Sequence, residues 1–344
     1  MVNHCFKMLF INFMAAAWLR DAALIAGAVT LAACATAPRE VPPAFGGGDA
    51  LAQPVASQRP SYSPWLSLTG ARQVGATDRT GTPAPTARAV GYTRFIRPVA
   101  LAARGGEMVI LDAGAGAAYR YDAALELMTA LPGIPAHTGA QLALGADFSL
   151  YVIDPPGRRV VRVARTGQPL TSYGSADLQR PVDVAVDDAR GLLYVADGGY
   201  NQLLAFHVLG GAATVLHMRG GAGLRLQAVG NIALGPDAIY VADPLCRCLG
   251  RVAFNGGLLN TFGHDAIGAP GPLAVDRSQH VFIIDQFERV LKVFHHGRLI
   301  DTLPPRRFGM QQFDDVWIDG NVLYLADGLS GRVEARRMTV SGGR

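Results

Sequence analysis

The chain has 344 residues, of which 50% are hydrophobic and 17% are charged, and its formal net charge is +4. Lys7 and Lys292 are the only lysines, and the arginines are scattered along the sequence rather than clustered. Because nucleic-acid-binding proteins usually concentrate basic residues in one patch, this composition argues against a nucleic-acid partner.

Residues 1–33 have the features of a bacterial export signal. An apolar run from Ala22 to Ala33 follows Arg20 and ends in small residues. The sequence Leu31-Ala32-Ala33-Cys34 resembles the lipobox of bacterial lipoproteins, which implies cleavage before Cys34 and attachment of diacylglycerol to its thiol. Ala35 follows in place of aspartate, so the resemblance also implies sorting to the outer membrane, facing the periplasm.

The same segment has two other interpretations, an ordinary signal peptide followed by a chance cysteine and a buried helix. A permanent membrane span is not expected, because Arg20-Asp21 divides the apolar stretch into pieces shorter than the roughly 20 residues that a span needs. Whether translation starts at Met1 or at Met14 stays open.

Residues 34–89 differ in composition from the rest of the chain. They contain eight of the 21 prolines and the run Gly46-Gly47-Gly48. Such a composition favours an extended tether over a packed domain.

Residues 90–341 contain six copies of a strand end in which an aliphatic-rich run is closed by aspartate. The aspartates are separated by 42, 43, 46, 42 and 42 residues, a period typical of propeller blades. Each copy holds about four short strands, so we predict an all-β, six-bladed propeller with four-stranded antiparallel blades. We expect the repeated aspartates to be structural, accepting N–H bonds in the turn after each strand and pairing with an arginine four or five residues on. They are Asp112, Asp154, Asp197, Asp243, Asp285 and Asp327.

The pattern resembles the NHL repeat family, in which a Pro-x-Gly-aliphatic-Ala-aliphatic-Asp stretch is followed by Tyr-Val-Ala-Asp and a basic turn. The third copy carries the resemblance best, with Pro181 to Asp187 followed by Tyr194 to Asp197. The resemblance spans roughly residues 92–340 and implies the propeller fold. It does not imply one activity, because the family includes both binding scaffolds and enzymes.

The sixth copy has only three strands of its own, and the last of them ends near Val340. Residues 65–68, Trp-Leu-Ser-Leu, alternate as a strand does. We expect this segment to supply the fourth strand of the last blade and so to close the ring, which removes an exposed sheet edge.

Aligned copies place one residue of each at a mouth of the central channel, where the innermost strands meet. Four of these six residues carry side-chain oxygens, and such a ring could coordinate Ca²⁺. Related six-bladed hydrolases and lactonases hold a central calcium, but polar residues at a water-filled channel mouth are also ordinary. The six are Ala100, Gln141, Asp183, Asn231, Pro272 and Asp315, of which Asp183, Asn231 and Asp315 replace the usual glycine of the NHL pattern.

No familiar catalytic motif occurs in the sequence, and we assign no catalytic residue, no metal ligand and no cofactor. Cys246 and Cys248 flank Arg247 in one repeat turn and could bind a soft metal or change redox state. No second cysteine pair or spaced histidine pair accompanies them, so no role is assigned to them either.

These observations favour a binding scaffold over an enzyme. We expect a lipid-anchored protein of the bacterial envelope whose partner is a protein, peptidoglycan or a polysaccharide. One alternative is a calcium-dependent hydrolase or lactonase acting at the channel mouth. Another is a subunit of an envelope export or assembly complex, which would show an exposed apolar patch on one face.

Overall fold

The computed structural model describes residues 59–74 and 89–340, all within one compact unit, Pro54–Arg344. The predicted signal peptide, Cys34 and most of the predicted tether lie outside the described residues. In the described part of the chain, no helix is both long and apolar enough to cross a membrane.

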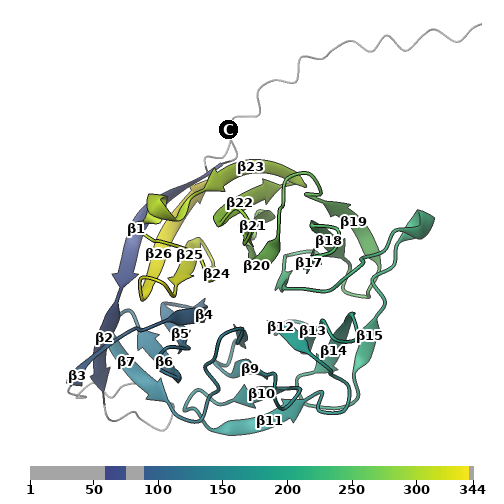
Figure 1. The fold of residues 1–344 in the computed structure, drawn as a ribbon. Coiled ribbons are helices and arrows are strands. Elements are labelled where there is room, and N and C mark those ends of the chain that lie inside the picture. The colour runs from purple at the N-terminus through teal and green to yellow at the C-terminus, as the bar shows by residue number, and fades with distance from the viewer. Residues whose placement is uncertain (1–58, 75–88, 341–344) are drawn as a thin grey trace, which may run out of the picture. The chain divides into compact units, whose positions relative to one another are not determined.

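Six sheets surround a central axis and form the predicted six-bladed propeller (Figure 1). Each sheet contains one blade of four antiparallel strands. From the inner to the outer strand, the blades are: blade 1, β4 (Pro98–Arg104), β5 (Glu107–Asp112), β6 (Ala117–Asp122) and β7 (Leu127–Leu131); blade 2, β8 (Leu142–Leu144), β9 (Leu150–Asp154), β10 (Arg159–Val163) and β11 (Pro169–Tyr173); blade 3, β12 (Pro181–Asp187), β13 (Leu192–Asp197), β14 (Gln202–His207) and β15 (Thr214–Leu216); blade 4, β16 (Ile232–Leu234), β17 (Ile239–Asp243), β18 (Cys248–Val252) and β19 (Leu258–Phe262); blade 5, β20 (Pro270–Val275), β21 (His280–Asp285), β22 (Val290–His295) and β23 (Arg298–Leu303); blade 6, β24 (Asp315–Asp319), β25 (Val322–Asp327), β26 (Arg332–Val340) and β1 (Pro60–Leu68).

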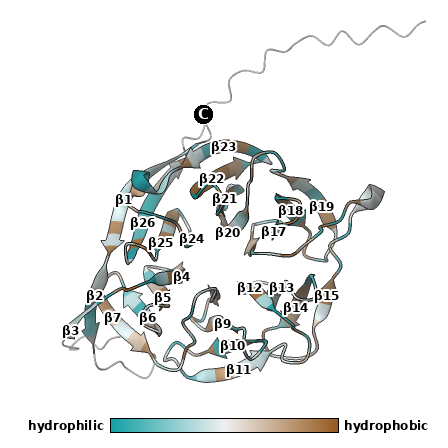
Figure 2. Cartoon of the chain, viewed as in Figure 1, coloured by the Kyte–Doolittle hydropathy of each residue, from teal (hydrophilic) through white to brown (hydrophobic). Residues whose placement is uncertain are grey.

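The hydrophobic core is divided among the six blade interfaces. Each of the six core clusters in the described residues contains side chains from two neighbouring blades. The two strands nearest the axis are therefore largely apolar on both faces, as in β21, where every residue is buried, whereas the outer strand β11 is mostly exposed. Figure 2 shows the resulting variation in hydropathy around the ring. Since one blade cannot bury its own faces, the blades are stable only together.

The repeated aspartates organise the turn between the second and third strands of each blade. Asp112 accepts N–H bonds from Gly114 and Ala115 in its turn, and also from Ile96 and Arg97 in the segment before β4. Four of the other five aspartates likewise join the turn to the segment before the inner strand of the same blade. The fourth residue after each aspartate has a left-handed backbone, with φ between 47° and 62°. These residues are Gly116, Arg158, Asn201, Arg247, Arg289 and Gly331.

The expected pairing of these aspartates with arginine is not general. Within the described blades it occurs at Asp154, which lies 2.9 Å from Arg159. Asp285 instead pairs with Lys292 at 2.7 Å. Backbone N–H groups satisfy most of the other carboxylate oxygens, so a cation is not needed there.

Strand β1 completes blade 6 as its outermost strand, the place that the sequence predicts for residues 65–68. It pairs antiparallel with β26, from Pro60 opposite Val340 to Leu68 opposite Val333. Trp65 is half-buried and packs edge-on against Tyr324 of β25, with ring centroids 6.0 Å apart.

The chain then continues onto blade 1, which the sequence did not predict. After β1, β2 (Gly70–Val74) runs parallel to β7, and β3 (Ala89–Arg94) lies outside β2, so this sheet has six strands. Gly70 permits the change of direction, because its φ is 147° and a Cβ there would lie 2.2 Å from the carbonyl oxygen of Thr93. The N-terminal segment therefore joins the last blade to the first along their outer edges.

We predict that this segment is required for stability. A fragment that starts at residue 70 lacks β1 and leaves the edge of β26 unpaired, so it should unfold at lower urea concentration than a fragment that starts at residue 54. Circular dichroism during urea titration measures both midpoints. Equal midpoints would show that blade 6 is stable with three strands.

Candidate functional site

The candidate channel residues lie on the face of the ring that carries the aspartate turns. In blade 3, Asp183 pairs with Ala196, directly before Asp197 and its turn. In blade 6, Asp315 pairs with Ala326 in the same way. We call the face that bears these six turns the turn face.

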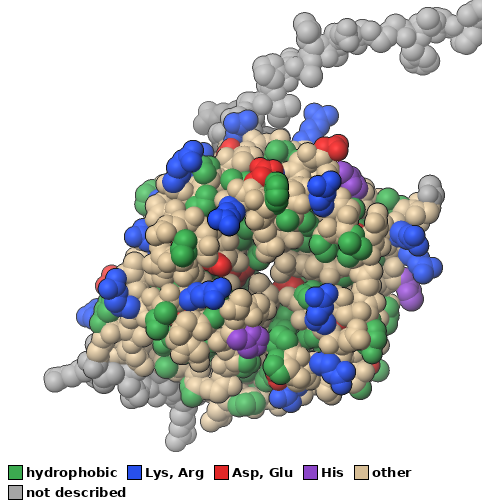
Figure 3. Space-filling view, in the orientation of Figure 1, with side chains coloured by type: hydrophobic (Ala, Val, Ile, Leu, Met, Phe, Trp, Pro, Cys, Tyr) green, Lys and Arg blue, Asp and Glu red, His purple; other side chains and the backbone are tan. Residues whose placement is uncertain are grey.

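The structure brings most of the predicted channel residues to one central cavity of about 150 Å³. Gln141, Asp183, Pro272 and Asp315 line this cavity along with apolar side chains of the inner strands. Asn231 is not among the lining residues, and its Nδ2 donates to Asp183 Oδ2 at 3.2 Å. Figure 3 shows a narrow opening at the centre of the ring with acidic side-chain atoms beside it.

The two channel carboxylates connect neighbouring blades. Asp183 Oδ2 accepts the N–H of Ile232 in blade 4 at 2.8 Å, and Asp315 Oδ2 accepts the N–H of Leu101 in blade 1, also at 2.8 Å. In both cases the donor is one residue beyond the equivalent channel position of the next blade. Each carboxylate therefore bridges two inner strands, and this gives both residues a structural role.

Asp183 has few lone pairs left for another ligand. Its Oδ1 accepts the N–H of Val184 at 2.8 Å, while its Oδ2 accepts both Ile232 N–H and the Asn231 amide. Since a carboxylate oxygen has two lone pairs, only Oδ1 keeps one. Calcium takes six to eight oxygen ligands, so a carboxylate with one free lone pair is poorly suited to a calcium site.

Burial makes both carboxyl groups harder to ionise. It raises the pKa of Asp183 to about 6, against the opposing effect of its N–H donors. Burial also raises the pKa of Asp315 well above its ordinary value, and the charge of Asp183 raises it further. The channel therefore holds two electrostatically coupled acids.

Side chains from blades 6 and 1 restrict the rest of the channel. Trp317 lines the cavity, packs against three of the six core clusters and donates from Nε1 to Ala103 O at 2.8 Å. Arg104 also lines the cavity and donates to Leu144 O at 3.3 Å and to Asp188 Oδ2 at 3.1 Å. These two large side chains account for the small volume.

The turn face also carries exposed apolar side chains that the sequence analysis missed. Leu245, Phe287 and Leu329 each lie two residues after a repeat aspartate and are 68%, 78% and 64% exposed. Tyr200 lies three residues after Asp197 in a neighbouring blade and is also exposed. The recurrence of a large apolar residue two positions after the repeat aspartate was a readable signal in the sequence. We call Tyr200, Leu245, Phe287 and Leu329 the apolar turn set.

No protein-family model matches the chain, and no curated protein matches it. Solved structures do resemble it. A gluconolactonase from Xanthomonas campestris shares 14% identity over 82% of this chain and 100% of that one, with a TM-score of 0.58. A catalytically inactive virginiamycin B lyase from Staphylococcus aureus, solved with quinupristin, shares 12% identity over 82% and 99%, with a TM-score of 0.54. A protein of unknown function from Bacteroides thetaiotaomicron shares 14% identity over 82% and 77%, with a TM-score of 0.56.

These similarities show a six-bladed β-propeller whose structural neighbours include a gluconolactonase and lyases. At such low identity they show the fold alone. No comparison shows that the chain belongs to the NHL repeat family, so that resemblance stays a prediction from the sequence.

The raised pKa of Asp183 predicts how stability depends on pH. The folded state keeps this proton up to about pH 6, whereas the unfolded chain loses it near pH 4, so this contribution to stability is full below pH 4 and is lost as the pH rises through 6. Asp183→Asn removes the titration, so its free energy of unfolding should fall less than that of the wild type between pH 4 and 7, by about 2–3 kcal/mol. Urea titrations at both pH values measure the difference.

Equal pH dependence in the two proteins would contradict the assignment of a raised pKa. A rise in the wild-type midpoint with calcium at pH 7, absent from Asp183→Asn, would instead support a cation site at the channel mouth.

Proposed function

We propose that this protein is a non-catalytic binding module of the bacterial envelope, which docks a protein partner on its turn face and is held at the outer membrane by acylated Cys34. The apolar turn set carries this proposal. Four neighbouring blades each expose one large apolar side chain on the same face, at nearly the same repeat position. Burial of such side chains against a partner is the main source of binding energy in protein interfaces.

Charged side chains on the same turns indicate the chemistry of the partner. Arg247 and Arg289 lie two residues beyond Leu245 and Phe287, and both are exposed. Arginine and large apolar residues together are typical of interface hot spots. They fit a protein surface with apolar pockets beside carboxylates better than they fit a polysaccharide, which presents mainly hydroxyl groups.

The channel favours this function over the enzyme alternative. Its volume of about 150 Å³ is below the 300–1,000 Å³ of typical small-molecule sites. Its two acids already bridge blades through backbone N–H groups. A substrate would have to displace these contacts or the side chains of Trp317 and Arg104.

The docking face can be tested with charge substitutions. The double variant Leu245→Asp/Phe287→Asp should lose most of its partner capture, because it places two charges in an interface that must become dry. The matched control, Leu170→Asp/Leu259→Asp, changes two exposed leucines on the outer strands β11 and β19, 54% and 49% exposed, and should capture partners as the wild type does. Crosslinking in intact cells, followed by quantitative mass spectrometry, measures capture.

Both variants should keep the wild-type unfolding midpoint, since the altered side chains are exposed. Equal capture by the turn-face variant and the wild type would refute the docking face. Loss in the outer-strand control alone would move the interface to the rim of the ring.

The anchor has a separate test. Cys34→Ser should keep the protein out of the outer-membrane fraction and remove the mass of the acyl chains, because no thiol is available for lipidation. Cys5→Ser, a change inside the predicted signal, should leave both properties unchanged. Membrane fractionation and intact-protein mass spectrometry measure the outcome, and a Cys34→Ser protein that still reaches the outer-membrane fraction would overturn the lipoprotein assignment.

A further inference from the structure

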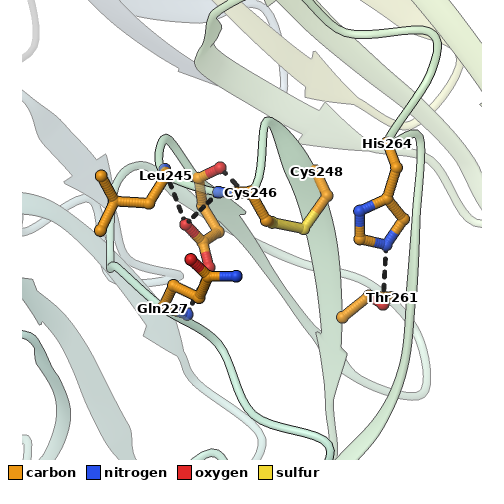
Figure 4. The surroundings of a disulfide bond; sticks show 7 residues. Gln227, Leu245, Cys246, Cys248, Thr261 and His264 are labelled. Atoms are coloured by element: carbon orange, nitrogen blue, oxygen red, sulfur yellow. Dashed lines mark hydrogen bonds between the residues drawn. A yellow bond between two sulfur atoms is a disulfide. The ribbon is translucent and has the colours of Figure 1, made fainter.

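Three potential metal ligands meet on the turn face at blade 4. Cys246 and Cys248 are joined by a disulfide, with their Cα atoms 5.2 Å apart. His264, in the segment after β19, lies beside them (Figure 4). The two sulfur atoms and a ring nitrogen of His264 all lie within 4.8 Å of one another. Nothing in the spacing of these residues joins His264 to the cysteines, because a loop and two strands lie between Cys246 and His264.

The turn that carries the cysteines does not depend on their disulfide. Asp243 Oδ1 accepts N–H bonds from Leu245 and Cys246, as Asp327 Oδ1 does from Leu329 and Ser330 in blade 6. The left-handed residue four positions after the aspartate is present in all six blades, and the other five turns contain no cysteine. Reduction of the bond therefore leaves the backbone in place and two thiols side by side.

His264 is held in an orientation suited to coordination. Its Nε2 lies 3.0 Å from Thr261 Oγ1. The other ring nitrogen, Nδ1, faces the two sulfur atoms in Figure 4. A hydrogen bond on the far nitrogen is the usual way in which proteins orient a metal-binding imidazole.

The three groups border an open groove of about 800 Å³. Asn201, Gln227 and Thr261 contribute polar side chains to its lining. Cys248 is fully buried while His264 is exposed, so the sulfur atoms lie at the base of the groove and the imidazole at its edge. The groove leaves room for a water molecule or another ligand beside a bound ion.

We propose that the reduced protein binds a thiophilic divalent cation, with Zn²⁺ as the reference ion, through Cys246 Sγ, Cys248 Sγ and His264 Nδ1. Two thiolates and one imidazole with an open fourth position form a known type of zinc coordination. The two thiolates balance the charge of the ion. The disulfide form is the metal-free state of the same site, so the site is controlled by redox state.

The chemistry balances in two steps. An external dithiol transfers two electrons and two protons to the Cys246–Cys248 bond, which breaks as the dithiol becomes a disulfide. Zn²⁺ then binds and the two thiols release two protons. With Zn–S distances of about 2.3 Å in a tetrahedral site, the sulfur atoms separate to about 3.8 Å, which side-chain rotation allows without movement of the backbone.

The test uses the mature, acylated protein in detergent solution, with Co²⁺ as a spectroscopic probe for Zn²⁺. After reduction with a dithiol and its removal under anaerobic conditions, we expect one equivalent of Co²⁺ to give thiolate-to-metal charge-transfer and tetrahedral ligand-field bands. One equivalent of Zn²⁺ should abolish these bands. The oxidised protein should show neither set of bands.

Variants separate the three ligands from nonspecific binding. Cys246→Ser and Cys248→Ser should each remove the charge-transfer bands, and His264→Ala should weaken Co²⁺ binding at least about tenfold while keeping the thiolate bands. His217→Ala, which changes an exposed histidine directly after β15 of blade 3, is the control and should bind as the wild type does. Cys246→Ser/Cys248→Ser should melt close to the wild type, because the turn forms without cysteines elsewhere in the ring.

Two results would overturn the proposal. One is a reduced, folded protein without charge-transfer bands. The other is equal Co²⁺ affinity in His264→Ala and the wild type, which would reduce the site to a thiol pair without a third ligand.

Discussion

A buried carboxylate at the end of the second strand is the interaction on which five of the six blades depend. In most blades it joins the turn ahead of it to the segment that leads into the inner strand, through three or four backbone N–H groups. Hydrogen bonds to a charged acceptor contribute about 1.5–3 kcal/mol each, more than neutral ones. The carboxylate also holds the next turn residues in one conformation, with a left-handed residue at the fourth position. The turn face is therefore built from six nearly identical units.

The channel carboxylates extend the same principle from within a blade to between blades. Asp183 and Asp315 stand where the NHL pattern has glycine, and each reaches the backbone of the next inner strand. Their ionisation is costly because they are buried, and the N–H donors offset only part of that cost. A carboxylate at a channel mouth can thus either bridge two blades or bind a ligand. It acts as a bridge when backbone N–H groups already occupy its lone pairs.

The fold was readable from the sequence because it depends on a local pattern repeated six times. Each copy repeats the aspartate, the apolar runs and the turn residues, so their period predicts a ring of six blades. The sixth copy has only three strands, which indicates that its fourth strand comes from another part of the chain. No repeated pattern in the sequence predicts the path of the chain from β1 to β2 and β3. This path depends on Gly70 and on the exposed edge of β7, and neither belongs to the repeat.

The sites were less readable, because they combine residues from different periods. The channel positions followed from alignment of the copies. The groups that donate hydrogen bonds to Asp183 and Asp315 are backbone N–H groups of the next blade, and no side chain in the sequence marks them. The meeting of His264 with Cys246 depends on how the segment after β19 folds back over the turn, which no spacing rule describes. The apolar turn set differs, since three of its four members share one offset from the repeat aspartate and could have been found by comparing the copies.

Repetition also explains how one face can carry several chemistries. Because the aspartate and the left-handed residue define the turn, the positions between and after them are free to vary without loss of the fold. Blade 5 uses them for Phe287, whereas blade 4 uses them for Leu245 and for the two cysteines that flank Arg247. A docking surface and a redox-controlled metal site can therefore coexist on neighbouring turns, since each changes side chains on a backbone that the carboxylates hold in place.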